Sequence, residues 1–293
     1  MNQPSLAIFA NFFIDNKERL QRMKDSFYSF KDTEPKEWVI NIRGGLKHEA
    51  GNFLKKELGE DLNLFFLQSK QGWMRDSNTI SKKINSDYVF YWIEDHILIS
   101  SPIDLKNCIM EMKEFNVDSF LYSFFLNEIK KQFNLIEPHK LGKYIKVYKL
   151  DQKNCSKIRK LVGEFYNVNC VSIMRKDFFI KILLSPKPYL KRWHRNLPFD
   201  FEKVSNDKVF PVIWYALPNQ EQFVAIDDDL YQPGYSLISR GLYLNRISRN
   251  NMKILEFGYL EKIKEQIRKL IPIKLRQLIL WPFKFFMRLF YTL

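Results

Sequence analysis

Three polar residues, Glu94, Asp95 and His96, directly follow a mostly apolar and aromatic run at residues 88–93. Two carboxylates and an imidazole at the tip of a buried strand are costly unless a cation lies against them. Carboxylate oxygens are hard ligands for Mg²⁺ or Mn²⁺, which commonly bridge to substrate phosphates. This acidic turn, Glu94 to His96, therefore indicates a divalent-metal or phosphate site. A strand-end turn that merely stays solvated is the alternative.

The segments before the acidic turn alternate between strand and helix patterns. Short apolar runs at 5–13, 37–42, 62–68 and 87–93 predict buried strands, and 17–30, 48–60 and 73–85 read as helices. Continuously apolar strands that alternate with helices predict an α/β fold, a Rossmann-like, mostly parallel sheet with helices on both faces. Ligands of such sheets bind at the carboxyl ends of strands, where the acidic turn falls.

The second half of the chain is less regular. A helix is predicted at 103–115, strands at 117–125 and 143–150, and a strand running into a helix at 170–184. Residues 185–203 read as loop, and a further strand precedes the acidic cluster at 227–229.

The order of these elements and the acidic turn resemble the glycosyltransferases of the GT-A fold. Those enzymes carry a short acidic motif, often Asp-x-Asp, after the fourth strand of a nucleotide-binding half. The stretch RDSNTISKKINSDYVFYWIEDH at 75–96 carries the resemblance, which covers residues 5–102 and continues more weakly to about 245. It implies transfer of a sugar from a nucleotide-diphosphate sugar, with Mg²⁺ or Mn²⁺ as cofactor. The motif here reads Glu-Asp-His, which leaves strict metal dependence open.

The resemblance also implies a donor site. It places Glu94 and Asp95 nearest the metal and diphosphate, with His96 as a ligand or as a hydrogen-bond donor to phosphate. Arg75, Asn78 and Lys82 lie three and four residues apart on the helix before the motif, so they share one face. The positive charges of Arg75 and Lys82 on that face would offset the negative charge of the diphosphate. The equally open alternative is that the arginines and lysines are ordinary surface residues and that Asn11 only terminates a strand. The implied nucleotide contacts are Ala10, Asn11, Phe12, Asn41, Arg43, Arg75, Asn78 and Lys82.

The stretch CVSIMRKDF at 170–178 resembles the strand and arginine turn before the acceptor-binding segment of these enzymes. The resemblance then offers Asp200 or Glu202 as the general base that deprotonates an acceptor hydroxyl, and His194 as a contact to the metal or diphosphate. The alternative is that the loop carrying these three residues is merely solvated and that the acidic cluster at 227–229 only caps a turn. The candidates for acceptor binding are Asp228 and Asp229, from the cluster that begins at Asp227, and Arg240.

The overall charge points to an anionic partner. The 293 residues carry a formal net charge of +14, and +7 of it lies in residues 262–293, where large apolar residues oppose Lys and Arg at helical spacing. That pattern predicts a basic amphipathic tail at 256–293 on a membrane surface, although a helix that packs on its own domain is the alternative. Residues 1–102 would form the nucleotide-sugar-binding half and 103–255 the acceptor-binding half.

The location follows from what the sequence lacks. Three widely spaced cysteines give no disulfide or zinc pattern, which favours a reducing cytoplasm. Neither a signal peptide nor a spanning helix is predicted, so we expect a peripheral protein on the inner face of the cytoplasmic membrane. The leading hypothesis is a transferase of bacterial surface polysaccharide biosynthesis, with a glycan or polyprenyl-linked acceptor. The alternative is a basic nucleic-acid-binding protein or a membrane scaffold with an inactive transferase fold.

Overall fold

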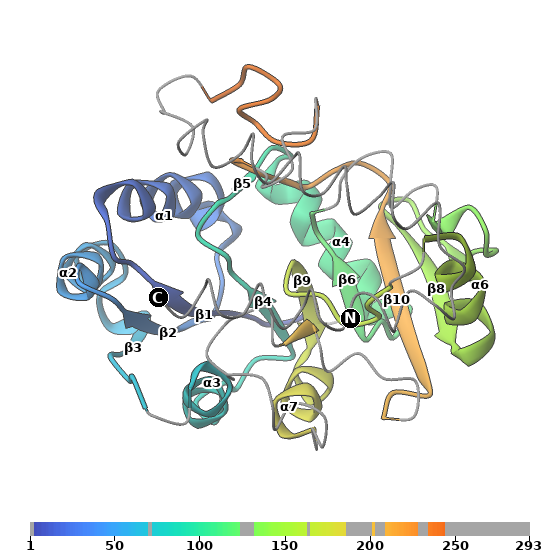
Figure 1. Ribbon diagram of the computed structural model, residues 1–293, viewed down its shortest axis with the longest axis horizontal. Coiled ribbons are helices and arrows are strands. Elements are labelled where there is room, and N and C mark those ends of the chain that lie inside the picture. Colours follow the sequence, from blue (N-terminus) through green and yellow to red (C-terminus); the bar gives the residue numbers. More distant parts are fainter. Residues whose placement is uncertain are drawn as a thin grey trace, which may run out of the picture.

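The computed structural model describes residues 3–69, 72–123, 132–162, 165–185, 201–202, 209–227 and 234–243. These residues form a nine-stranded sheet in the order β3-β2-β1-β4-β9-β6-β10-β8-β7 (Figure 1). The strands are β1 (Leu6–Phe13), β2 (Glu37–Arg43), β3 (Leu62–Phe65), β4 (Tyr88–Tyr91), β6 (Ser119–Leu121), β7 (Lys140–Leu141), β8 (Ile145–Asp151), β9 (Ser172–Arg175) and β10 (Val212–Pro218).

Most strands of this sheet run in one direction. β3, β2, β1 and β4 are mutually parallel neighbours. β9 lies antiparallel between β4 and β6, so β6 and its parallel neighbour β10 run the same way as β4. The carboxyl ends of β1, β2, β4 and β6 therefore meet at one edge, which we call the carboxyl edge. The predicted mostly parallel α/β sheet is confirmed.

Helices cover both faces of the sheet, as predicted (Figure 1). One face packs against α1 (Lys17–Phe30), α2 (Lys47–Leu58) and α4 (Pro102–Glu114). The other packs against α3 (Trp73–Ser81), α6 (Gln152–Val162) and α7 (Lys176–Leu184). Two short 3-10 helices, η1 (Lys31–Thr33) and η2 (Gly59–Asp61), follow α1 and α2.

Helix α1 shows why the sequence folds this way. Its N-cap Asn16 accepts a hydrogen bond from the Arg19 amide, which satisfies one of the open N–H groups of the first turn. Its apolar side chains recur at helical spacing and are buried against the sheet. They are Leu20, Met23, Phe27 and Phe30.

A small second sheet pairs β5 (His96–Leu98) with β11 (Phe223–Ala225) in antiparallel register. It contacts α1, and the segment 234–243 packs against it. Apart from β5 and β11, the described strands of both predicted halves belong to one continuous main sheet, while the predicted tail at 256–293 lies outside the described residues.

Two further expectations can be compared with the structure. The three cysteines are buried and none forms a disulfide. No helix in the part of the chain that the structure describes is long and apolar enough to cross a bilayer. Helix α6 and strand β10 were not predicted, and the strand expected at 62–68 ends as β3 at Phe65.

Candidate active site

The acidic turn lies where the sequence placed it, at the carboxyl end of β4. Glu94 and Asp95 form the turn, and His96 begins β5. The amide of Trp92 donates to the carbonyl of Phe9 at 2.8 Å, so the chain leaves the sheet beside the middle of β1. All three side chains of the turn are half-buried. The turn is therefore part of the carboxyl edge.

Helix α1 and the segment after β11 hold the backbone of the acidic turn. The buried hydroxyl of Ser26 accepts from the Trp92 indole at 2.8 Å and donates to the His96 carbonyl. The Ser29 hydroxyl accepts from the Leu98 amide at 2.9 Å. On the other side, the Ile226 amide donates to the Asp95 carbonyl at 2.7 Å. The acidic side chains are thus presented by a fixed backbone.

The two carboxyl groups of the turn have different protonation behaviour. Nδ1 of His96 lies 2.7 Å from a carboxylate oxygen of Asp95. Burial alone would raise the pKa of Asp95, but the charges of His96 and Arg22 hold this pKa below its usual value. Burial, together with the Asp95 carboxylate, raises the pKa of Glu94 to about 7. Near neutral pH, Asp95 is therefore an anion, and Glu94 is partly protonated.

Arg22 links this turn to a residue of the predicted acidic cluster. Its guanidinium is buried and lies 2.6 Å from Asp227, and it also contacts Glu18 one helical turn earlier. Burial opposes the charge, but these two carboxylates raise the pKa of Arg22. Asp227 is therefore committed to an internal ion pair, whereas Asp228 and Asp229 lie outside the described residues.

Two arginines lie close to Phe13, the last residue of β1: Arg19 in the first turn of α1 and Arg43 at the end of β2. The guanidinium groups of Arg19 and Arg43 each lie 5.8 Å from the centre of the Phe13 ring, which is 41% exposed. Nε of Arg43 is buried and has no hydrogen-bond partner among the residues that the structure describes. Burial lowers the pKa of Arg43, opposed by the nearby Asp76, Tyr91 and Glu94. A half-buried cation beside the acidic turn suits an anionic ligand.

The other residues predicted at these strand ends lie inside the protein. Asn11 and Asn41 are buried, and their side-chain amides bond to each other at 2.9 Å. Asn11 also donates to Ser77, and Asn41 both donates to and accepts from the backbone of Leu67. These amides position the strand ends, and a direct contact with a nucleotide stays a prediction. Ala10 and Phe12 are likewise buried.

Helix α3 turns the predicted cationic face away from the sheet. Arg75 and Lys82 are exposed and Asn78 is half-buried. The inward face instead carries Asp76, which accepts from the Ser69 amide at 3.1 Å, and Ser77. The three predicted residues do share a face, but that face points to solvent because Trp73, Met74 and Ile80 occupy the core.

Glu202, one of the two candidates for a general base, is brought to the carboxyl edge. One of its carboxylate oxygens accepts from the Cys170 amide at 3.0 Å. Burial raises the pKa of Tyr91 well above its usual value, and both Glu202 and Glu94 add to this rise. The hydroxyl of Tyr91 thus lies near both carboxyl groups. Asp200 and His194 lie outside the described residues.

Arg240, predicted to bind the acceptor, is engaged within its own segment. It forms two contacts with the buried Glu221 carboxylate, at 2.9 and 3.3 Å, and its Nε donates to the Gly234 carbonyl. These contacts stabilise the segment after β11. A direct acceptor contact by Arg240 stays a prediction.

The described residues test the predicted metal ligands only in part. They contain no group of three or more metal-ligating side chains, so Glu94, Asp95 and His96 do not converge as a three-ligand cage. His96 instead bonds to Asp95. Two neighbouring carboxylates are still sufficient for an ion that substrate phosphates complete.

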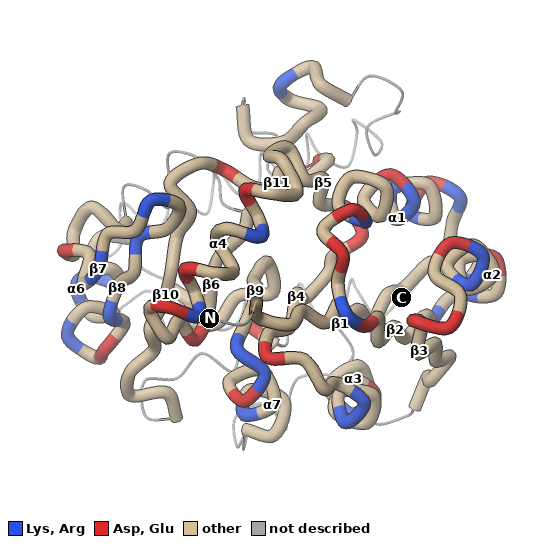
Figure 2. Tube along the Cα trace, turned by 180° about the vertical axis from the view of Figure 1, so that it is seen from behind, with Lys and Arg blue, Asp and Glu red and all other residues tan. Residues whose placement is uncertain are grey.

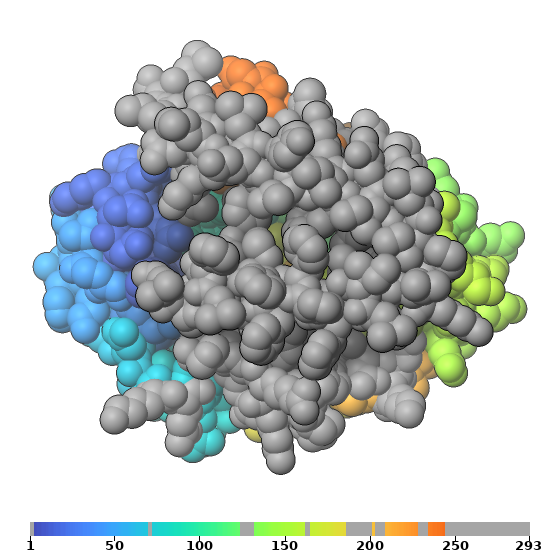
Figure 3. Space-filling view, in the orientation of Figure 1, coloured from blue at the N-terminus to red at the C-terminus, as the bar shows by residue number. Residues whose placement is uncertain are grey.

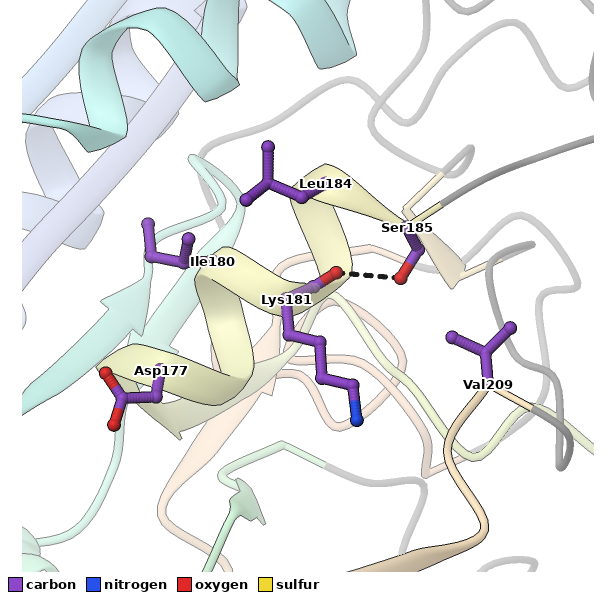
Figure 4. Close-up of a pocket in the computed structure, with 6 residues that line it drawn as sticks. All are labelled: Asp177, Ile180, Lys181, Leu184, Ser185 and Val209. Carbon is purple, nitrogen blue, oxygen red and sulfur yellow. Dashed lines mark hydrogen bonds between the residues drawn. The ribbon is translucent and has the colours of Figure 1, made fainter.

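A cavity of about 390 Å³ lies elsewhere, on α7 (Figure 4). It is lined by Asp177, Ile180, Lys181, Leu184, Ser185 and Val209, and none of these is a predicted site residue.

Sequence reasoning missed four residues of the site: Phe13, Arg19, Arg22 and Tyr91. Arg19 and Arg22 lie three residues apart on the helix directly after the first strand, a spacing that puts them on one face. That was the available signal. Phe13 and Tyr91 gave none, because aromatic residues are common in buried strands.

No protein-family model and no curated protein matches this sequence. Among solved structures, the chain is similar to residues 1–349 of S. aureus TarS, with 12% identity, a TM-score of 0.44, and coverage of 87% of this chain and 70% of that one. The same TarS fragment in complex with UDP gives a TM-score of 0.43. The chain spans 43% of the longer TarS structure.

A weaker similarity is to the mannosyltransferase PcManGT from Pyrobaculum calidifontis in complex with GDP-Man and Mn²⁺. It has 11% identity and a TM-score of 0.36, and it covers 45% of this chain and 39% of that one. These similarities concern the fold alone.

Proposed function

We propose that this protein is a glycosyltransferase that moves a sugar from a nucleotide-diphosphate sugar to a glycan or lipid-linked acceptor. The observation that carries the proposal is the carboxyl edge itself. There, Glu94 of the acidic turn lies near the half-buried Arg43, and Glu202, which accepts from the Cys170 amide, lies near Tyr91. Such a transfer requires cations that offset the charge of the phosphates. It also requires a separate carboxylate that removes the proton of the acceptor hydroxyl.

The proposed roles follow from chemistry and position. The positive charges of Arg43 and the neighbouring Arg19 offset the negative charge of the donor diphosphate. Glu94 and Asp95 would hold a Mg²⁺ or Mn²⁺ ion, which would supply positive charge to the leaving diphosphate. Glu202, or Asp200, removes the proton of the acceptor hydroxyl. The Asp95–His96 contact fixes the orientation of the Asp95 carboxylate.

The biological setting is the finer part of the proposal. We place the enzyme in bacterial surface polysaccharide biosynthesis, at the inner face of the cytoplasmic membrane. The support is the composition of residues 262–293, where eight Lys or Arg and one acid are interleaved with large apolar residues. A membrane-bound location suits an acceptor that is carried on a lipid.

The direct test is turnover of nucleotide-sugars. Purified full-length protein is incubated with UDP-, GDP- and CMP-sugars, and release of the nucleotide is measured with and without Mn²⁺. We expect Asp95→Asn and Glu94→Gln to reduce release at least about 100-fold, since each would remove a carboxylate that holds the metal ion against the reacting diphosphate. Asp61→Asn, at an exposed carboxylate in η2, is the matched control. Release that is equal in all variants would rule out this site.

A further inference from the structure

The second concentration of positive charge in the chain lies in the folded domain. Residues 139–162, which we call the basic end, contain eight Lys or Arg and one acid. This net charge of +7 equals that of residues 262–293, so the two stretches account for the whole +14. Seven of the eight basic residues are exposed lysines. They are Lys140, Lys143, Lys146, Lys149, Lys153, Lys157 and Lys160.

The fold gathers these lysines at one end of the main sheet. β7 is the edge strand and pairs with β8, which places Leu141 opposite Lys146. Helix α6 turns Cys155 and Ile158 into the core, so its lysines stay on the outer side. Figure 2 shows the basic positions of β7, β8 and α6 together, and Figure 3 shows β8 and α6 (green) at the surface opposite α1 and α2 (blue).

Little of this charge is neutralised nearby. Lys149 lies 3.6 Å from Asp151. Within the part of the chain that the structure describes, no carboxylate lies within 4.0 Å of the side-chain ammonium groups of the other six lysines. The Glu111 carboxylate lies against the backbone amide of Lys143. Exposed cations in such number attract an anionic surface.

Exposed leucines distinguish this end from an ordinary solvated face. Leu141 is 69% exposed, Leu161 is 59% exposed and Leu135 is 40% exposed. Protruding leucines among lysines match the composition of surfaces that enter a bilayer interface. Phosphate recognition in nucleic acids favours the planar fork of arginine and stacking aromatic rings, and this end has one arginine among its eight basic residues.

We propose that the basic end is a docking surface for a bilayer of anionic phospholipid. The lysines lie among the headgroup phosphates, and Leu141 and Leu161 enter the boundary with the acyl chains. The inference rests on residues 135–162 alone. It depends neither on the glycosyltransferase proposal nor on residues 262–293, so the failure of one leaves the others untouched.

The test is vesicle flotation of the full-length protein. The probes are vesicles of phosphatidylcholine alone and of phosphatidylcholine with phosphatidylglycerol. Each lysine near an anionic surface contributes about fivefold to partitioning. We therefore expect Lys153→Glu/Lys157→Glu/Lys160→Glu to weaken binding to anionic vesicles at least on the order of 100-fold. The control Lys55→Glu/Lys56→Glu/Lys83→Glu makes the same change in net charge at exposed lysines of α2 and the end of α3.

Any contribution from other parts of the chain multiplies the partition coefficient equally in both triple variants. Equal losses in the two would show that net charge alone governs binding and would overturn the proposal. Circular dichroism melting of each variant establishes that it is folded before the comparison.

A second pair of variants separates a bilayer from a nucleic acid. Leu141→Ser/Leu161→Ser leaves the charge unchanged, and we expect it to weaken vesicle binding severalfold because two inserted side chains are lost. A single-stranded RNA 20-mer is titrated in parallel by fluorescence anisotropy. If the α6 triple variant loses RNA binding while vesicle binding is unchanged, the surface binds nucleic acid and the proposal is wrong.

Discussion

Arg22 is the residue at which distant parts of the chain meet around the acidic turn. Its guanidinium contacts Asp227, which lies 205 residues away along the chain, and it lowers the pKa of Asp95 against the effect of burial. A buried cation with two carboxylate partners leaves those partners uncompensated when it is removed. The charge of the site is therefore set partly by residues that do not belong to the acidic turn itself.

Asn41 gives a stability prediction at the same scale. Its amide bonds to both backbone groups of Leu67 and to Asn11, all in the interior. Asn41→Ala leaves these groups without partners, so we expect a loss of about 2–4 kcal/mol in the free energy of unfolding. Urea denaturation measures it, with the exposed Asn52→Ala as control. A loss below about 0.5 kcal/mol would show that the network contributes little.

At the scale of elements, Glu111 of α4 fixes the turn that leads into β8. Its carboxylate accepts from the amides of Lys143, Tyr144 and Ile145 at 2.8–2.9 Å. We expect Glu111→Ala to destabilise the protein by about 2–3 kcal/mol, because three backbone donors lose a charged acceptor. Glu114→Ala, at an exposed position of the same helix, should change stability by less than about 0.5 kcal/mol. Thermal and urea unfolding of both variants distinguish the two outcomes.

The starts of β1 and β4 are joined by Asp87, which accepts from the amide and hydroxyl of Ser5 at 2.9 and 3.0 Å. The hydrogen bond from the Ser5 amide is the main cause of the lowered pKa of Asp87. A lowered pKa in the fold means that the carboxylate stabilises the protein above its unfolded-state pKa of about 4. That contribution is lost as pH falls through the folded-state pKa.

We therefore expect Asp87→Asn to be less stable than wild type at pH 7 by roughly 0.5–1 kcal/mol, because Asp87 is exposed. The difference should vanish toward pH 2. Urea unfolding of both proteins across this range measures it. Curves that stay parallel down to pH 2 would show that the ionised form of Asp87 is not responsible.

For the whole molecule, the sequence predicted what local periodicity determines. β1, α1 and β2 combine strong apolar runs with helical spacing, and their bounds agree with the structure within about two residues. Helix α6 was missed because Cys155 and Ile158 are the only buried residues among those of its side chains that the structure describes, so its pattern reads as polar. The antiparallel placement of β9 between β4 and β6 depends on pairings between distant segments, which no local pattern specifies.

The same distinction explains the candidate site. The acidic turn was predictable because it interrupts an apolar strand, and Arg43 because it ends one. Whether a polar strand-end residue faces a ligand or the interior depends on its packing partners. Asn11 and Asn41 face inward because Trp73, Ser77 and Leu67 supply their hydrogen bonds, and those partners are distant in sequence.

The central claim is that the carboxyl edge binds a nucleoside diphosphate through Arg43, and thermal shift with UDP, GDP and CDP tests it most directly. A ligand that binds only the folded state raises the melting temperature. At a ligand concentration of 100 times Kd, it stabilises the folded state by about 2.7 kcal/mol. We predict that at least one of these nucleotides stabilises wild type and the outward-facing Arg75→Ala variant but not Arg43→Ala. If no nucleotide shifts the melting temperature, with or without Mn²⁺, or if Arg43→Ala responds like wild type, the account is contradicted.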